Sequence, residues 1–380
     1  MNIAIYGVNS NSGILERKTI ISKASDISYS AKVRDIGSFS FDLPVEASGV
    51  EFLKKGFYVS IGNEFDGVIR DVVLKEDSNG CIYTVSGQCL KGLLSQRLII
   101  PPAEENEVNT LGYDAVKGSS EYCIKHYWNA NMVNTTSGYR SIPGIDVAIN
   151  QSRGIKEDKY LARYDVLSDV TTAITADAKL GVSAKIDLEK KMIVFDVFEG
   201  RVCTSNQSIN PRLIFELERR NIDSLEYTDS FENMKNVFYT TKSGAEFEDE
   251  ALTLTYYRDE DIPTGIERFE QHLTLSAETP VEGGEYDELK RLAVIEMRNY
   301  EATQAITAQI SRYNYFEDYF LGDIVTVRSR RGGILADMEI TEVQVSYGDA
   351  SRSVTVTFGD ADISSFGRIK RDIKNIKGVF

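Results

Sequence analysis

The segment Phe52-Leu53-Lys54-Lys55-Gly56, followed by Phe57-Tyr58-Val59-Ser60-Ile61, opens a pattern that recurs later in the chain as Tyr319-Phe320-Leu321-Gly322 followed by Asp323-Ile324-Val325-Thr326-Val327. Two further strand-like segments complete each copy. In the first copy they are Gly67-Val68-Ile69 and Tyr83-Thr84-Val85-Ser86-Gly87. In the second copy they are Met338-Glu339-Ile340 and Val354-Thr355-Val356-Thr357-Phe358-Gly359. Because a pattern that occurs twice indicates two similar structural units, we predict two related β-barrels in which Gly56 matches Gly322 and Gly87 matches Gly359. The alternative is that two unrelated antiparallel meanders share such a pattern by chance.

Length and charge limit the class of protein. A chain of 380 residues exceeds one ordinary domain, and several domains are expected. The formal net charge of −15 disfavours a general nucleic-acid-binding protein, which needs a positive surface to displace phosphate counterions. The same charge would suit a surface past which DNA slides, or it serves only solubility. No stretch of about 18 apolar residues occurs, so we expect no stable membrane insertion.

The order of local patterns predicts a mainly β fold with an α+β insert. Ser38 to Leu43 alternates apolar and polar residues as a half-buried strand does, whereas residues 114–128 and 165–180 have helical spacing, with Asp165 as the expected N-cap. We predict two tandem β-barrel domains plus peripheral domains. Their expected bounds are 1–100 for the first barrel, completed by 205–245, then 101–204 for the inserted α+β domain, 246–360 for the second barrel and 361–380 for a C-terminal connector.

The sequence contains no recognisable catalytic or metal-binding motif. Neither His126 nor His272 lies in a pattern of metal ligands or of an activated nucleophile. The acidic loops lack the spacing of a calcium-binding loop. We therefore predict no enzyme activity, no catalytic residue, no cofactor and no metal, although paired carboxylates or the abundant Tyr and Phe residues leave a sugar site open.

The C-terminal segment differs from the rest of the chain. Residues 366–377 are locally basic, and the isoleucines recur at helical spacing. This pattern is typical of a helix that docks on a partner. The residues expected to dock are Arg368, Ile369, Ile373 and Ile376.

Three stretches resemble the tail-hub family of long-tailed bacteriophages and related contractile particles. They are Arg34-Asp35-Ile36-Gly37-Ser38-Phe39-Ser40-Phe41-Asp42-Leu43-Pro44, Gly67-Val68-Ile69 with Val85-Ser86-Gly87-Gln88-Cys89-Leu90-Lys91-Gly92-Leu93-Leu94-Ser95-Gln96-Arg97, and Phe316-Glu317-Asp318-Tyr319-Phe320-Leu321-Gly322-Asp323-Ile324-Val325 with Tyr347 and Val356-Thr357-Phe358-Gly359. Their order is that of the family and they are spread over most of the chain, but residues 101–204 carry little of the resemblance.

The resemblance implies a structural virion protein, made in the host cytoplasm and located at the tail tip or baseplate. Members of this family are homotrimers that adapt a hexameric tail tube to a trimeric tip, because two barrels in each of three chains present one surface six times. The implied partners are the tail tube or distal tail protein, the tape-measure protein, a spike, fibre or plug protein, and DNA in passage, which meets an acidic channel wall without specific binding. The alternatives are a carbohydrate- or receptor-binding tail module and a cell-wall-degrading enzyme.

Removal of residues 362–380 tests the role expected of the C-terminal segment. The truncated chain should still assemble into rings, while particles that carry it should lack the distal component, because the docking isoleucines are gone. The measurement is the protein content of purified particles. A normal complement of distal proteins would contradict this role, and loss of the ring would assign the segment to assembly instead.

Overall fold

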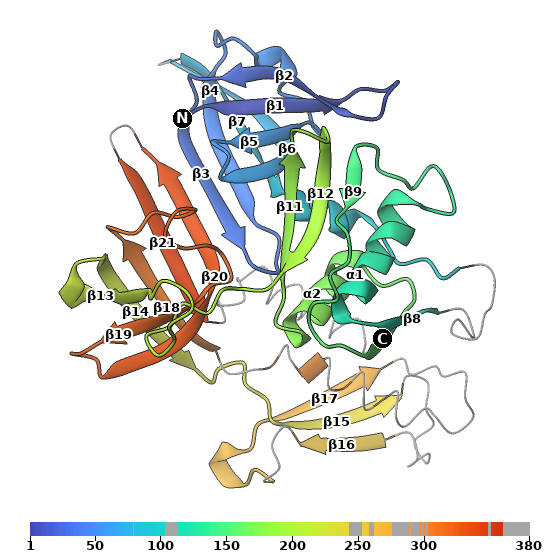
Figure 1. Ribbon diagram of the computed structural model, residues 1–380, viewed down its shortest axis with the longest axis vertical. Helices are drawn as coiled ribbons and strands as arrows, with labels where there is room; N and C mark the ends of the chain where they lie inside the picture. Colours follow the sequence, from blue (N-terminus) through green and yellow to red (C-terminus); the bar gives the residue numbers. More distant parts are fainter. Residues whose placement is uncertain are drawn as a thin grey trace. The chain divides into compact units, whose positions relative to one another are not determined.

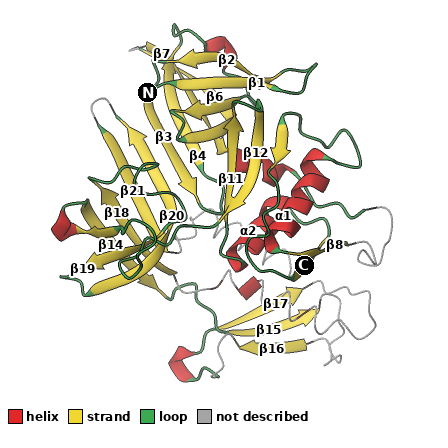
Figure 2. Cartoon of the chain, viewed as in Figure 1, coloured by secondary structure: helices red, strands yellow, loops and turns green. Residues whose placement is uncertain are grey.

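The computed structural model of the chain describes residues 1–78, 80–102, 113–242, 253–257, 262–275, 303–348 and 351–359, together with residues 289, 293, 296, 297 and 300. The chain divides into two compact units, Met1–Leu225 with Thr307–Phe358, and Glu226–Ile306 with Gly359–Phe380. Most of the described elements are strands, and the helices labelled α1 and α2 lie beside β11 and β12 (Figures 1 and 2). The predicted mainly β fold class is therefore confirmed.

A large sheet carries both copies of the repeat. Its strand order is β14-β18-β21-β20-β3-β4-β7-β6-β5-β1-β2, with β19 on β20 and β13 on β19. The strands at the N-terminal end of the chain are β1 (Ile3–Val8), β2 (Leu15–Ile21), β3 (Ser25–Lys32), β4 (Ser38–Pro44), β5 (Tyr58–Ile61), β6 (Phe65–Asp77) and β7 (Gly80–Cys89). The others are β13 (Ile214–Glu216), β14 (Ile222–Ser230), β18 (Thr303–Ile310), β19 (Ile324–Ser329), β20 (Ile334–Tyr347) and β21 (Arg352–Gly359).

The two copies of the repeat have the same strand order. The first reads β5-β6-β7-β4-β3 across the sheet, and the second reads β19-β20-β21-β18-β14. Each begins at a glycine with positive φ, and the N–H of that glycine donates to the second strand: Gly56 to the carbonyl of Ile69 at 2.9 Å, and Gly322 to that of Ile340 at 2.8 Å. A register shift follows Ile69 and Ile340 alike. The predicted repeat and the match of Gly56 with Gly322 are thus confirmed.

One part of the expected match is wrong by one residue. The registers across the two bulges align Gly87 with Phe358, and not with Gly359. In the first copy, the ring of Phe39 on the neighbouring strand β4 fills the space beside Gly87, because a Cβ at Gly87 would lie 2.7 Å from an atom of this ring. In the second copy the buried ring of Phe358 belongs to the aligned position itself.

The described strands do not close into two separate barrels. The last strand of the first copy, β3, pairs antiparallel with β20 of the second copy, so the copies share one sheet. Residues 205–245, expected to complete the first barrel, contain β13, β14 and β15 (Val237–Lys242). Of these, β13 pairs with β19 and β15 pairs with β16 (Thr253–Tyr257) and β17 (Glu270–Leu275).

The described part of the insert contains two α-helices, a π-helix and two small sheets. Its elements are β8 (Asp114–Gly118), α1 (Ser120–Trp128), the π-helix Asn129–Val133, β9 (Ile145–Val147), β10 (Asp158–Ala162), α2 (Leu167–Asp177), β11 (Gly181–Asp187) and β12 (Met192–Phe198). The expected helix over 114–128 begins only at residue 120, because the Ser119 hydroxyl caps it by accepting from the Tyr122 N–H at 3.2 Å. Val166, and not Asp165, is the N-cap of α2.

The insert shares a hydrophobic core with the first copy. Tyr58 and Val68 of the first copy belong to the same buried cluster as Trp128 and Phe195 of the insert. In the second unit, β15, β16 and β17 form a three-stranded sheet, and Phe238 packs in a core with Leu273, Met297 and Tyr300. Short 3-10 helices join these elements at Val50–Phe52, Leu90–Gln96, Leu217–Arg219 and Gly265–Glu267. No helix among the described residues is long and apolar enough to span a bilayer.

The paired glycines give a matched test of the repeat. Gly56→Ala should reduce the free energy of unfolding by about 1 kcal/mol, since its added Cβ meets open space and only the positive φ is unfavourable. Gly322→Ala should cost more, because its Cβ would also approach a ring atom of Phe198 to 2.7 Å. Urea unfolding of both variants checks the order. Equal losses would show that the Phe198 ring moves aside freely.

Candidate functional site

The join between the two copies lies where β3 meets the C-terminal half of β20. The ladder runs from Ile27 opposite Tyr347 to Lys32 opposite Glu342, and β20 (red) lies beside β3 (blue) in Figure 1. The Nζ of Lys32 is 3.9 Å from the Glu342 carboxylate. Backbone pairing therefore fixes one copy against the other within the chain.

A carboxylate at the join holds three donors from both copies. Glu64 lies between β5 and β6 of the first copy. Its Oε2 accepts from the hydroxyl of Tyr29, from the hydroxyl of Tyr347 at 3.0 Å, and from Nη2 of Arg352 at 2.9 Å. Burial, together with the negative charge of Glu64, raises the pKa of Tyr347 to about 12, so this hydroxyl remains a donor at neutral pH.

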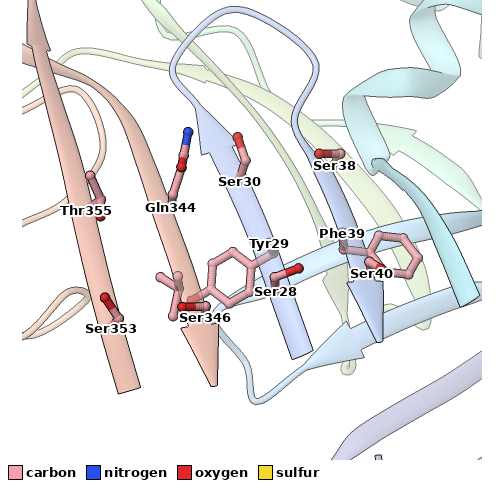
Figure 3. A pocket seen from close by; sticks show the side chains of 11 residues that line it. Ser28, Tyr29, Ser30, Ser38, Phe39, Ser40, Gln344, Ser346, Ser353 and Thr355 are labelled. Carbon is pink, nitrogen blue, oxygen red and sulfur yellow. The ribbon is translucent and has the colours of Figure 1, made fainter. Parts of the chain in front are cut away.

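The sheet at the join has one apolar and one polar face. Tyr29, Phe39, Val345 and Val354 lie opposite one another on four adjacent strands and are all buried. The alternate positions form two rows on the other face (Figure 3): Ser38-Ser30-Gln344-Thr355 and Ser40-Ser28-Ser346-Ser353. These side chains line a shallow hollow of about 370 Å³. None of the residues that line it is charged.

The first copy has an open edge at the position that the join occupies in the second copy. β6 pairs with β7 along one of its edges. Along the other edge, β5 pairs only with Phe65 to Val68. No described strand pairs with the rest of this second edge, Asp71 to Asp77. When the two copies are aligned at their bulges, Leu74 of the first copy corresponds to Val345 of the second. Leu74 is 52% exposed, whereas Val345, covered at the join, is 2% exposed.

The two histidines take part in local contacts. His126 Nε2 lies 2.8 Å from Oδ1 of the buried Asp114, and His272 Nε2 lies 3.1 Å from the hydroxyl of Thr241. Within the described ranges, no group of three or more His, Cys, Asp or Glu residues is placed to hold a metal ion.

A buried ionic cluster ties the insert together. Lys125 Nζ donates to Glu121 and Asp196 at 2.6 Å each, and to the carbonyl of Ile149 at 3.0 Å. Burial opposes ionisation of Glu121, but hydrogen bonds from Lys125 and from the Arg153 N–H outweigh it and lower the pKa of Glu121. All three of the Lys125 hydrogens are used, so the cluster is structural.

The predicted docking residues Arg368, Ile369, Ile373 and Ile376 lie outside the described residues. The join and the open edge were not predicted from the sequence. Their signal is the alternation Ser28-Tyr29-Ser30 and Gln344-Val345-Ser346, in which neutral polar residues stand where charged residues are more usual on a solvated strand face.

Removal of the central carboxylate tests how strongly the join is held. Glu64→Ala leaves two tyrosine hydroxyls and the Arg352 guanidinium without their acceptor, and should lower the free energy of unfolding by roughly 2–4 kcal/mol. The exposed Glu51 gives a control, since Glu51→Ala should change stability by less than about 0.5 kcal/mol. Chemical denaturation measures both. A loss at position 64 no larger than at position 51 would show that backbone pairing alone maintains the join.

Comparison with known proteins identifies the family. No curated protein matches the sequence significantly. The structure is similar to the 43 kDa tail protein of prophage MuSo2 from Shewanella oneidensis (TM-score 0.56, 13% identity, covering 94% of this chain and 98% of that chain) and to a tail protein from Neisseria meningitidis MC58 (TM-score 0.52, 13% identity, 95% and 97%).

A third similar structure is the lidded Francisella PdpA-VgrG complex (TM-score 0.51, 10% identity, covering 94% of this chain and 52% of that chain). At these identities the likeness shows a shared fold. A family profile described as Siphovirus ReqiPepy6 Gp37-like protein matches residues 11–360. The chain therefore belongs to the Siphovirus ReqiPepy6 Gp37-like protein family, and it shares the fold of the two phage tail proteins named above.

Proposed function

We propose that the chain is a tail hub that forms a closed ring of three copies at the distal end of the tail tube. The observation that carries the proposal is the exposure of Leu74 where its counterpart Val345 is buried. At the intrachain join, the strand that pairs with β20 beside Val345 is β3, the last strand of the preceding copy. In a ring, β14 of one chain would cover β6 of the next chain as β3 covers β20.

This contact joins different surfaces of identical chains, so it is heterologous. Heterologous contacts repeat around a circle and close when the rotation permits. With two copies per chain, three chains would present six similar sheets, which matches a hexameric tube above and a trimeric tip below. The pairing would also remove an open strand edge, which otherwise invites aggregation.

The polar rows of Figure 3 supply a wall suited to a DNA channel. Hydroxyl and amide side chains at Ser30, Ser38, Gln344 and Thr355 carry no charge, so a passing phosphate backbone finds no fixed cation there. The wall expected from the net charge was acidic. The centre of this face is neutral, which avoids trapping DNA without the repulsion of a negative wall.

The remaining partners follow from this position in the virion. We propose that the ring contacts the tail tube and the tape-measure protein on one side and a spike, fibre or plug protein on the other, with the segment around Ile369 and Ile373 as the distal contact. The inserted domain over 101–204 would then lie outside the channel. A carbohydrate-binding role is less well supported, because Tyr29 and Phe39 beside the hollow are buried and offer no exposed ring on which a sugar can stack.

The exposed leucine of the open edge tests the ring. Wild-type protein should have a mass three times the 42.5 kDa of one chain. Leu74→Glu should yield a folded monomer, since the side chain is already exposed in the single chain and a charge would be buried only on assembly. Leu188→Glu is the control, because Leu188 is 64% exposed in the β11–β12 turn and is not part of the open edge Asp71 to Asp77.

Sedimentation and circular dichroism of the three proteins measure mass and fold. A wild-type chain that stays monomeric, or a Leu74→Glu variant that assembles as well as the control, would contradict the proposed ring.

A further inference from the structure

An arginine-rich corner lies at the turn between β19 and β20. The carboxylate of Glu216 is fully buried and receives three guanidinium groups: Nε of Arg219 at 3.1 Å, Nε of Arg328 at 3.6 Å and Nε of Arg330 at 2.9 Å. Arg331 follows in the exposed turn. One carboxylate thus faces three cations, and the corner is positive in a chain whose net charge is −15. The Arg328 and Arg330 contacts hold the base of the turn in place.

The repeat defines what this turn corresponds to in the first copy. The last pair of β5 and β6, Ile61 with Phe65, aligns with Val327 and Ala336 in β19 and β20. Leu335 therefore occupies the position of Glu64. In the second copy the hairpin continues for two more pairs, Arg328 with Leu335 and Ser329 with Ile334, before it turns. The second copy thus presents a longer, basic arm where the first copy presents Glu64.

The intrachain join shows where such an arm reaches. Glu64 of the first copy contacts Tyr347 and Arg352, which flank the β20–β21 turn of the second copy. Applied to the next chain in a ring, the same relation directs the basic arm of the second copy to the β6–β7 hairpin of the neighbouring first copy. The bulge alignment gives Glu76 as the counterpart of Tyr347 and Cys81 as that of Arg352.

The β6–β7 hairpin has the complementary character. Asp71, Glu76 and Asp77 outnumber Lys75 on the exposed part of β6, and the apolar Leu74 and Val73 are about half exposed beside them. Leu335 on the arm is 71% exposed. In the proposed ring, an exposed apolar residue flanked by cations would face exposed apolar residues flanked by carboxylates, and opposite charges at the edge of a contact favour the correct pairing.

We propose that the partner of the Arg330–Arg331 turn is the Glu76–Asp77 hairpin of a second copy of this chain, with Leu335 packed near Cys81. This inference rests on the proposed ring and specifies which surfaces form the chain-to-chain contact. The charges are reversed relative to the intrachain join. In the proposed contact the turn is basic and the hairpin is acidic, whereas at the intrachain join the turn carries the carboxylate and the hairpin carries the arginine. That reversal distinguishes the contact between chains from the one within a chain and prevents the two from exchanging.

Charge reversal tests the pairing in the full chain. Arg331→Glu and Glu76→Arg should each weaken ring formation about tenfold, because each brings like charges together. The double variant Arg331→Glu/Glu76→Arg should recover assembly to within about threefold of wild type, since it restores opposite charges. Arg17→Glu, an exposed arginine on β2, changes the net charge as Arg331→Glu does and should leave assembly unchanged. The concentration of half-assembly by sedimentation is the readout.

Cross-linking tests the same contact by distance. Leu335→Cys treated with a short bismaleimide should join to the native Cys81 of the next chain and give covalent dimers and trimers, and Cys81→Ser in the same background should abolish them. The other three cysteines are buried. A wild-type ring with neither cross-linking nor charge recovery would overturn this inference and leave the proposed ring standing. A wild-type chain that remains monomeric would overturn both.

Discussion

The antiparallel ladder between β3 and β20 is the contact on which the arrangement of the large sheet depends. It converts two copies of a five-stranded unit into one sheet, and it leaves the equivalent edge of the first copy open. A backbone ladder is well suited to this purpose because its hydrogen bonds need no particular side chains, so two copies with different sequences can use the same geometry. Specificity then falls to the side chains at the ends of the ladder, above all Glu64.

The two faces of this sheet have separate constraints. The buried face needs side chains that fill its space, and two aromatic rings (Tyr29 and Phe39) on the first copy and two valines (Val345 and Val354) on the second do so. The solvated face is constrained by charge instead, because hydroxyl and amide groups there neither attract nor repel a polyanion strongly. The strict alternation of a strand lets the two constraints be met by alternate residues without compromise.

The net charge of −15 is not distributed evenly over the described residues. Buried carboxylates such as Glu216 and Glu121 are neutralised by arginine and lysine, whereas Asp71 and Glu76 are exposed on an open edge. Charged residues on an edge strand hinder indiscriminate pairing. If the edge has one correct partner with a basic arm, the same charges that prevent aggregation also select that partner.

The sequence by itself determined the repeat, the mainly β class and the alternation of strands such as Ser38 to Leu43, because these features depend on local periodicity and on glycines that adopt a positive φ. The match of Gly87 with Gly359 failed by one residue because a bulge and a ring from a neighbouring strand, Phe39, decide that alignment. Only the tertiary structure decided which strands pair across the copies, since pairing between distant strands depends on edges that become available after each copy folds. For the same reason Leu74 and Val345 look alike in the sequence, and only the fold shows that one is covered and the other is exposed.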